Sequence, residues 1–380
     1  MKKGASAPPD LSMSAPDIGD RERELVSGVL EGTYLSGGPM VERFEGAIAT
    51  RSERKHAVAV SSGTAGLHLA VKALGIGAGD KVATTAFSFA ASVNCFLYEG
   101  AEPLFADIDP ETFSIDPEAL ETVCADDKVA AILPVDVFGQ PADLTSIGQI
   151  ADRFGVPLIE DACEALGSTH DGRPAGSFGA AGVFAFYPNK QITTGEGGVL
   201  VTDDDRVAAL VRSYRNQGRG EGSDWFDHVR LGFNYRLDEM SAALGVAQME
   251  RVDELLTARA RVAARYDAAL AGIEGVRSPK IAPQTTKMSW FVYVVTLDRG
   301  IDRDRIAAYL ADRGVPTRAY FRPIHLQKYM IERYGTRFGS LPITEDIGRR
   351  TIALPFHGRL SEESVGFVAE TLSEAISAIA

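Results

Sequence analysis

Hydrophobic residues between positions 55 and 202 occur in short runs, and stretches with helical spacing separate the runs. Five runs have the length and composition of buried strands: 56–60, 81–85, 103–107, 129–135 and 156–161. Amphipathic patterns fill the intervals: 64–74, 88–99, 117–124 and 143–154. Strands that alternate with helices in this way predict an α/β fold with a mostly parallel central sheet.

Two further apolar runs, 182–186 and 197–202, are predicted strands as well. Only ten residues separate them, whereas a parallel crossover needs about a dozen or more. We therefore expect this pair to be antiparallel, with Lys190 in the connection between its strands.

After residue 203 the pattern changes to longer helical repeats around one apolar strand. It predicts three helices and a strand: 239–270, 302–314, 361–378 and, for the strand, 290–297. We interpret "RARVAAR" (259–265) as the solvated face of the first of these helices. The change of pattern predicts a flexible tail, a large domain and a smaller C-terminal α/β domain: 1–12, 13–250 and 251–380.

The composition is ordinary for a water-soluble globular protein, with 380 residues of which 45% are hydrophobic and 24% charged. The net charge of −13, from 39 basic and 52 acidic residues, argues against a nucleic-acid surface, since such a surface needs clustered Lys and Arg. An anionic small ligand remains compatible with this charge, because a few local groups are enough to hold a phosphate.

Cysteines, histidines and apolar runs exclude further classes of protein. Cys95, Cys124 and Cys163 form no CxxC pair, so we expect buried thiols in a reducing cytoplasm. The six histidines have no metal-ligand spacing, and we expect no metal site. The N-terminal segment has no apolar core and no run approaches eighteen apolar residues, so we expect neither a signal peptide nor a membrane span.

Four features lie at predicted strand ends, where open α/β sheets bind ligands. After the strand at 56–60, a Ser-Ser-Gly turn leads into a helix at Gly63, Thr64 and Ala65. Backbone N–H groups at a helix start form an anion site, although a plain N-capped helix explains the same residues. Phe89 follows the strand at 81–85, and it either lies flat on a ligand ring or belongs to the core.

The other two features are charged. Asp161 ends an apolar strand, where a carboxylate is costly unless it meets a cation such as a protonated pyridine nitrogen; capping the next segment is the alternative. Glu164, three residues later, can face the same site. Lys190 lies between an aromatic run and a glycine turn. Its amine can form an imine with an aldehyde and carry protons, and the alternative is a solvated loop lysine.

Together the four features match pyridoxal phosphate. The helix start suits the phosphate, the aromatic side chain suits the ring face, the aspartate suits the ring nitrogen and the lysine suits the aldehyde. The conjunction favours this cofactor more strongly than any single feature does.

Six segments in order resemble the DegT/DnrJ/EryC1/StrS family of sugar aminotransferases, across residues 18–378. They are "GTYLSGGPMVERFE" (32–45), "SSGTAGLHLA" (61–70), "IEDACEALGS" (159–168), "FYPNKQITTGEGGVLVTDD" (186–204), "LGFNYRLDEMSAALGVAQ" (231–248) and "RPIHLQ" (322–327). The lysine segment and the Asn-Tyr-Arg segment are the most specific of the six.

The resemblance implies fold type I of the pyridoxal-phosphate (PLP)-dependent transferases and assigns roles to single residues. Lys190 would be the Schiff-base lysine and the catalytic acid and base. Asp161 would pair with the pyridinium nitrogen, and Phe89 would stack on the ring. Glu164 falls where the family often has glutamine, near the phenolic oxygen of the cofactor.

Other roles implied by the resemblance concern the phosphate and the sugar. Gly63, Thr64 and Ala65 would hold the phosphate from the helix start. Asn234 would reach the phosphate of the neighbouring subunit's cofactor, which makes a homodimer with shared active sites the functional unit. Tyr320 and His325 lie where the family lines its sugar site.

Two positions depart from the family pattern. Ala185 stands where many members have a serine that donates to the phosphate, and the loss of one such hydrogen bond is worth roughly 1.5–3 kcal/mol if no water replaces it. Gln217 stands where histidine is common, which affects the substrate contacts expected there.

The activity implied by the resemblance is transfer of an amino group from an amino acid, expected to be L-glutamate, to a keto group of a nucleotide-linked (deoxy)sugar. The product would serve a surface polysaccharide or a glycosylated natural product. A sugar dehydratase-like lyase of the same fold is one alternative, but it would have histidine in place of Lys190. A non-catalytic PLP-binding regulator is the other alternative.

Overall fold

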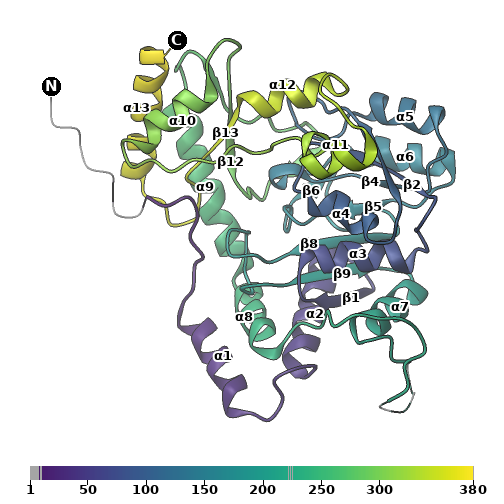
Figure 1. Cartoon of the computed structure of the whole chain (residues 1–380). Coiled ribbons are helices and arrows are strands. Elements are labelled where there is room, and N and C mark those ends of the chain that lie inside the picture. The colour runs from purple at the N-terminus through teal and green to yellow at the C-terminus, as the bar shows by residue number, and fades with distance from the viewer. Residues whose placement is uncertain (1–7, 9–10, 221, 223, 225, 380) are drawn as a thin grey trace.

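A twisted central sheet forms the body of the molecule in the computed structural model, which describes residue 8 and residues 11–220, 222, 224 and 226–379 (Figure 1). Its strands follow the spatial order β3 (Glu102–Ala106), β2 (Lys81–Thr85), β4 (Ala131–Leu133), β5 (Ile159–Asp161), β8 (Ala181–Ala185), β9 (Gly198–Thr202) and β1 (His56–Val60), with β4 and β5 joined by isolated bridges. Among these strands β9 alone runs against its neighbours. The predicted mostly parallel sheet and the antiparallel pair β8–β9 are therefore confirmed.

Helices cover both faces of this sheet, because its strands are buried on both sides. Along β1, Val58 and Val60 pack in the cluster that contains α3 (Gly63–Ala73), whereas Ala57 and Ala59 pack in the cluster that contains α2 (Pro39–Ser52). The other helices of this part are α1 (Asp20–Glu31), α4 (Ala91–Leu97), α5 (Pro117–Asp126), α6 (Leu144–Phe154), α7 (Asp205–Arg215) and α8 (Glu239–Glu250).

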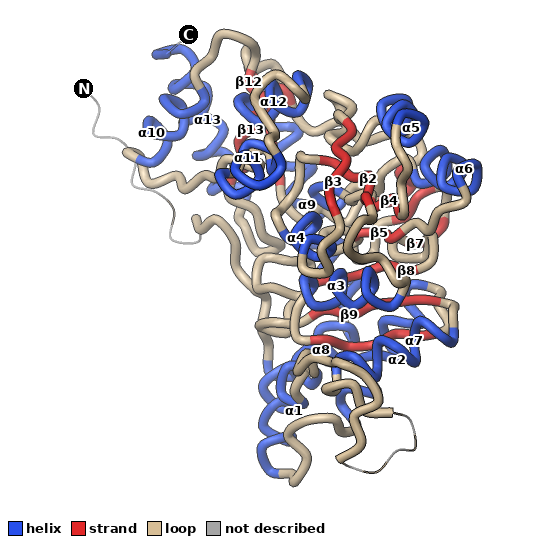
Figure 2. Tube along the Cα trace, turned by 45° about the vertical axis from the view of Figure 1, so that its right-hand side comes forward, coloured by secondary structure: helices blue, strands red, loops and turns tan. Residues whose placement is uncertain are grey.

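The C-terminal part contains a smaller antiparallel sheet in the order β10 (Val276–Arg277), β12 (Tyr293–Leu297) and β13 (Thr351–Leu354). The helices of this part are α9 (Val252–Leu270), α10 (Arg303–Ala311), α11 (Lys328–Tyr334), α12 (Pro342–Arg350) and α13 (Glu362–Ile379). Figure 2 shows helices α10 to α13 at the opposite end of the molecule from α1. A third sheet consists of β11 (Thr285–Lys287), β6 (Thr169–His170) and β7 (Arg173–Pro174).

The predicted helix over 239–270 is wrong as a single element. α8 ends at Glu250 and α9 begins at Val252, because Arg251 has a non-helical backbone with φ −127° and ψ 22°. α8 packs against α1 and α2, whereas α9 packs against α13. The break therefore allows two consecutive helices to pack in different layers of the molecule. This break lies next to residue 250, where we expect the boundary between the large and the small domain. That boundary stays a prediction.

Other predicted elements differ in extent or environment. β4, β5 and α4 are shorter than the runs 129–135, 156–161 and 88–99, since ladder and helix hydrogen bonds end before the apolar pattern does. The interpretation of 259–265 as a solvated face is wrong for Arg259, Val262 and Ala263, which are buried against neighbouring elements. Helices α1, α2, α7, α11 and α12 and strand β13 were not predicted.

Two of the predicted absences concern metals and membranes. Within the described residues, no helix is long and apolar enough to cross a bilayer. The same residues contain no group of three His, Cys, Asp or Glu side chains that could hold a metal ion. Most of the expected tail at 1–12 lies outside the described residues.

Glu239, the first residue of α8, holds the start of α2 across a long sequence separation. Its side chain is buried and accepts hydrogen bonds from the N–H groups of Gly38, Met40 and Val41 at 2.8–3.1 Å. These N–H groups precede the first helical hydrogen bonds of α2, so they need an acceptor from elsewhere.

We predict that Glu239→Ala lowers the free energy of unfolding by about 2–4 kcal/mol, because it leaves these N–H groups without a partner. Urea unfolding of the variant and the wild type measures the difference. Glu31→Ala, at an exposed position at the end of α1, is the matched control and should change the free energy by less than about 0.5 kcal/mol. An equal loss in both variants would contradict the capping role.

Candidate active site

A cavity of about 540 Å³ opens at the carboxyl ends of the parallel strands β1, β2 and β5. Seven of the predicted site residues line it: Gly63, Thr64, Phe89, Asp161, Glu164, Lys190 and Tyr320. Ala65, Asn234 and His325 are not among the residues that line it. Strand ends that share one edge of a sheet bring together side chains that are far apart in the sequence.

The start of α3 forms one wall of the cavity. Ser62 caps the helix by accepting a hydrogen bond from Ala65 N at 3.1 Å, and the N–H groups of Gly63 and Thr64 have no partner inside the helix. A Cβ atom on Gly63 would lie 2.6 Å from Ala185 Cβ and 2.9 Å from Cys163 Sγ, so only glycine fits this close approach. The helix start therefore offers free N–H groups where Gly63 packs closely against Ala185 and Cys163.

Asp161 lies at the end of β5 and is 3% exposed. Its Oδ2 accepts a hydrogen bond from Ser92 Oγ at 2.7 Å and its Oδ1 accepts one from Cys163 N at 3.2 Å. No Lys, Arg or His of the described chain lies within 4 Å of this carboxylate. A buried carboxylate whose protein partners are all neutral fits a cationic ligand group such as a protonated pyridine nitrogen.

Cys163 lies beside Asp161 on the cavity wall. Burial, together with the negative charge of Asp161, raises the pKa of its thiol well above the usual value. This shift favours the neutral thiol over the nucleophilic thiolate. Ser92 and Cys163 were not predicted as site residues, since neither has a spacing that marks it; Cys163, expected as a buried thiol, is partly exposed.

Lys190 lies in the connection between β8 and β9, in a turn closed by its own N–H to Tyr187 O at 2.9 Å. Its side chain is only 12% exposed, which rules out the solvated loop lysine. Its Nζ lies 3.8 Å from the centre of the Phe291 ring and 3.4 Å from Glu164 Oε1. One amine is thus held between an aromatic face and a carboxylate.

Glu164 is held in place from its other side. Its Oε2 accepts a hydrogen bond from Phe138 N at 2.8 Å. Phe138 has a positive φ of 60°, which is uncommon for a bulky residue and marks a backbone constrained by its surroundings. Burial raises the pKa of Glu164, and the nearby Lys190 opposes that shift.

The remaining predicted residues lie in different environments. Phe89 is 65% exposed on the cavity wall, so it does not belong to the core and its ring is free to stack on a ligand. Tyr320 comes from the C-terminal part of the chain and lines the same cavity. His325 is fully buried, and its Nε2 lies 3.0 Å from Glu345 Oε1. Asn234 is exposed and forms a bridge with Asn216.

The two departures from the family pattern can also be located. Ala185 lines the cavity beside the start of α3 and contributes no hydroxyl there. Gln217 has a positive φ of 57° next to the strand-like pair of Asn216 and Asn234, outside the cavity.

The cavity fits pyridoxal phosphate on three independent observations. Free N–H groups at a glycine-dependent helix start suit a phosphate, a buried carboxylate without a protein cation suits the ring nitrogen, and a shielded amine suits the aldehyde. The exposed ring of Phe89 supplies a face for stacking.

Comparisons with known proteins agree with this chemistry. A profile described as the DegT/DnrJ/EryC1/StrS aminotransferase family matches residues 16–373. GDP-perosamine synthase of Caulobacter vibrioides is 38% identical over 97% of this chain and 99% of that protein, and the spore coat polysaccharide biosynthesis protein SpsC of Bacillus subtilis is 34% identical over 96% and 97%. The structure of Helicobacter pylori PseC, an aminotransferase involved in the biosynthesis of pseudoaminic acid, superposes with a TM-score of 0.91 at 27% identity over 97% of this chain and 99% of that one.

We predict that Asp161→Asn retains bound cofactor but lowers turnover by at least about a hundredfold, because a neutral amide does not keep a ring nitrogen protonated. Absorbance measures the cofactor, and a coupled assay of the released 2-oxo acid measures turnover. Asp127→Asn, at a surface carboxylate paired with Lys81, is the control and should leave both unchanged. Turnover of Asp161→Asn within a few-fold of wild type would contradict the role of this carboxylate.

Proposed function

The chain belongs to the DegT/DnrJ/EryC1/StrS aminotransferase family, and from this membership we propose that it transfers an amino group from L-glutamate to a keto group of a nucleotide-linked (deoxy)sugar. The family is one of PLP-dependent aminotransferases of fold type I, and this chain is a PLP-dependent aminotransferase. The observation that carries the proposal is the shielded amine of Lys190, 3.4 Å from Glu164 in the cavity that Asp161 also lines.

The relatives support the nature of the acceptor and the destination of the product. The name GDP-perosamine synthase supports a nucleotide-linked sugar as the acceptor. The name of SpsC, a spore coat polysaccharide biosynthesis protein, supports a surface polysaccharide as the destination.

Residues of this chain would hold the cofactor from three sides. The N–H groups of Gly63 and Thr64 at the start of α3 would bind the phosphate, and Phe89 would cover one ring face. Asp161 would hold a proton at the ring nitrogen, since Ser92 and Cys163 N keep the carboxylate in place. When bound, pyridoxal phosphate supplies an aldehyde that accepts the amino group and a ring that takes up an electron pair.

Lys190 would move the proton. In the first half-reaction its Nζ would take the proton from the α carbon of the amino-acid donor and pass it to the carbon that was the cofactor's aldehyde carbon. In the second it would take a proton back from that carbon and deliver it to the acceptor carbon of the sugar. Glu164, whose oxygen lies 3.4 Å from this amine, would orient it between the two transfers. Phe291 below the amine would keep bulk water away from the transferred proton.

The two alternative functions make different demands on these residues. A dehydratase-like lyase must not keep its cofactor on a lysine, so a shielded Lys190 argues against it. A non-catalytic regulator has no need for a carboxylate beside an amine or for Asp161 at a ligand ring. Lys190 and Asp161 both line the cavity, and this favours a transaminase over the two alternatives.

A homodimer with shared sites is part of the proposal. Asn234 is exposed and lies outside the cavity of its own chain. The hairpin that follows α7 also exposes Phe226, Val229 and Leu231, and the loop after α1 exposes Tyr34. Large apolar side chains exposed on one hairpin, as Phe226, Val229 and Leu231 are, are typical of surfaces that a partner covers.

We predict that the wild type converts L-glutamate to 2-oxoglutarate and aminates at least one member of a panel of nucleotide ketosugars, as mass spectrometry of the products would measure. Lys190→Ala should lose at least about a thousandfold in turnover while remaining folded, because no other group replaces a nucleophilic amine. Lys287→Ala, at an exposed lysine, is the control. If no amino acid changes the absorbance of the wild-type cofactor, the chain is a regulator instead.

We predict that activity reappears when an Asn234→Ala chain is mixed with a Lys190→Ala chain. In the mixed dimer one site would carry both lesions and the other site neither, because Asn234 would act in the partner's site. Mixing Asp161→Asn with Lys190→Ala is the matched control: these residues share one cavity within one chain, so every mixed site stays damaged. If heterodimers form and the first mixture stays inactive, Asn234 does not act across the interface.

A further inference from the structure

Arg259, on α9, is a buried cation without an acidic partner. The residue is 5% exposed, and no carboxylate of the described residues lies within 4 Å of its guanidinium. Burial alone lowers the pKa of this group to about 10, so it is still charged at neutral pH. A charge in such a place needs other polar partners to replace its water.

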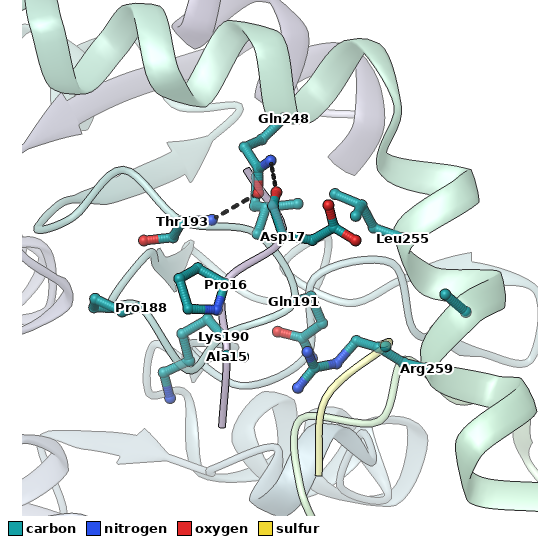
Figure 3. Close-up of a pocket in the computed structure, with 13 residues that line it drawn as sticks. Ala15, Pro16, Asp17, Pro188, Lys190, Gln191, Thr193, Gln248, Leu255 and Arg259 are labelled. Atoms are coloured by element: carbon teal, nitrogen blue, oxygen red, sulfur yellow. Dashed lines mark hydrogen bonds between the residues drawn. The ribbon is translucent and has the colours of Figure 1, made fainter. Parts of the chain in front are cut away.

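The partners of Arg259 are backbone carbonyls from two segments that meet at Lys190. Its Nε donates to Trp290 O at 2.7 Å, and its Nη2 donates to Phe291 O at 2.6 Å and to Asn189 O at 3.4 Å. Trp290 has a positive φ of 55°, which is uncommon for a bulky residue. Figure 3 shows Arg259 extending from its helix toward the loop that carries Lys190 and Gln191.

These carbonyls belong to the residues that place the reacting amine. Asn189 directly precedes Lys190, and the ring of Phe291 lies 3.8 Å from Lys190 Nζ. On the other side of the lysine, Gln191 Nε2 donates to Ser289 Oγ at 2.8 Å. The lysine connection and residues 289–291 are therefore joined at two points, and Arg259 makes one of them.

We propose that Arg259 is a positioning residue, which fixes the Lys190 amine against Phe291 and thereby sets how fast this amine joins the cofactor aldehyde. In that reaction the nitrogen forms a double bond to the aldehyde carbon, and the carbonyl oxygen leaves as water with both amine hydrogens. The inference rests on the proposed function only in taking Lys190 as the reacting amine. A planar guanidinium is suited to this role because its fork reaches several carbonyls at once, which an ammonium does not.

Two measurements distinguish a misplaced Lys190 amine from general damage to the cofactor site. Enzyme stripped of cofactor is mixed with pyridoxal phosphate, and the absorbance change gives the rate of attachment. Affinity for pyridoxine phosphate, which has no aldehyde, reports the phosphate and ring contacts alone. The variants are Arg259→Lys, Arg259→Gln, Phe291→Leu and the double variant Arg259→Lys with Phe291→Leu. Arg265→Lys is the control, because Arg265 lies on the same helix as Arg259 but donates to Leu360 O, away from the lysine connection.

We expect Arg259→Lys to slow attachment by about ten- to a hundredfold, with little change in pyridoxine phosphate affinity, since a small misplacement of a reacting group has effects of this size. Arg259→Gln should be at least as slow, and the double variant should be no slower than the slower single variant. Attachment at the wild-type rate, a parallel loss of pyridoxine phosphate affinity, or multiplicative effects in the double variant would overturn the proposal. Failure of the wild type to attach the cofactor at Lys190 would overturn the proposed function instead.

Discussion

Charged groups buried in and beside the cavity must find protein partners that replace water, and this requirement shapes the site. Asp161 is satisfied by a hydroxyl and a backbone N–H, both neutral. Glu164 is satisfied by Phe138 N and by the amine of Lys190. Arg259 is satisfied by the backbone carbonyls of Asn189, Trp290 and Phe291. Because Ser92, Phe138 and Lys190 lie far along the chain from the carboxylates that they contact, satisfying these charges also places the segments.

The period of two along a strand decides which carboxylate can act on a ligand. Glu160 and Asp161 are consecutive in β5 and so point to opposite faces of the sheet. Glu160 accepts hydrogen bonds from Gly176 N and Phe178 N, and it lies against Asp136, whose pKa is raised well above the usual value by burial and by the charge of Glu160. One carboxylate thus stabilises the fold, while its neighbour is left with only neutral partners at the cavity.

Two residues with an uncommon backbone conformation lie close to the Lys190 amine. Phe138 and Trp290 both have positive φ values, and each presents a backbone group to a residue near Lys190. Phe138 offers its N–H to Glu164, and Trp290 offers its carbonyl to Arg259. Such conformations persist only where the surroundings over-determine them, and the hydrogen bonds from Gln191 to Ser289 and from Arg259 to Phe291 contribute to this here.

Local patterns in the sequence determined the elements and much of the site. The runs at 56–60 and 81–85 are strands with those bounds, and the short connection around Lys190 required the antiparallel pair β8–β9. An open α/β sheet gathers its strand ends at one edge, so residues next to strand ends can be predicted to lie together. Asp161 and Lys190 do line one cavity.

Only the tertiary structure decided the partners. Ser92 as the donor to Asp161, Arg259 as a buried cation and His325 as the partner of Glu345 depend on contacts between distant segments. The break of the 239–270 pattern at Arg251 also has a tertiary cause, since α8 and α9 pack in different layers. Periodicity reports which face of an element is apolar, but the neighbour that meets this face is set by the packing of the whole chain.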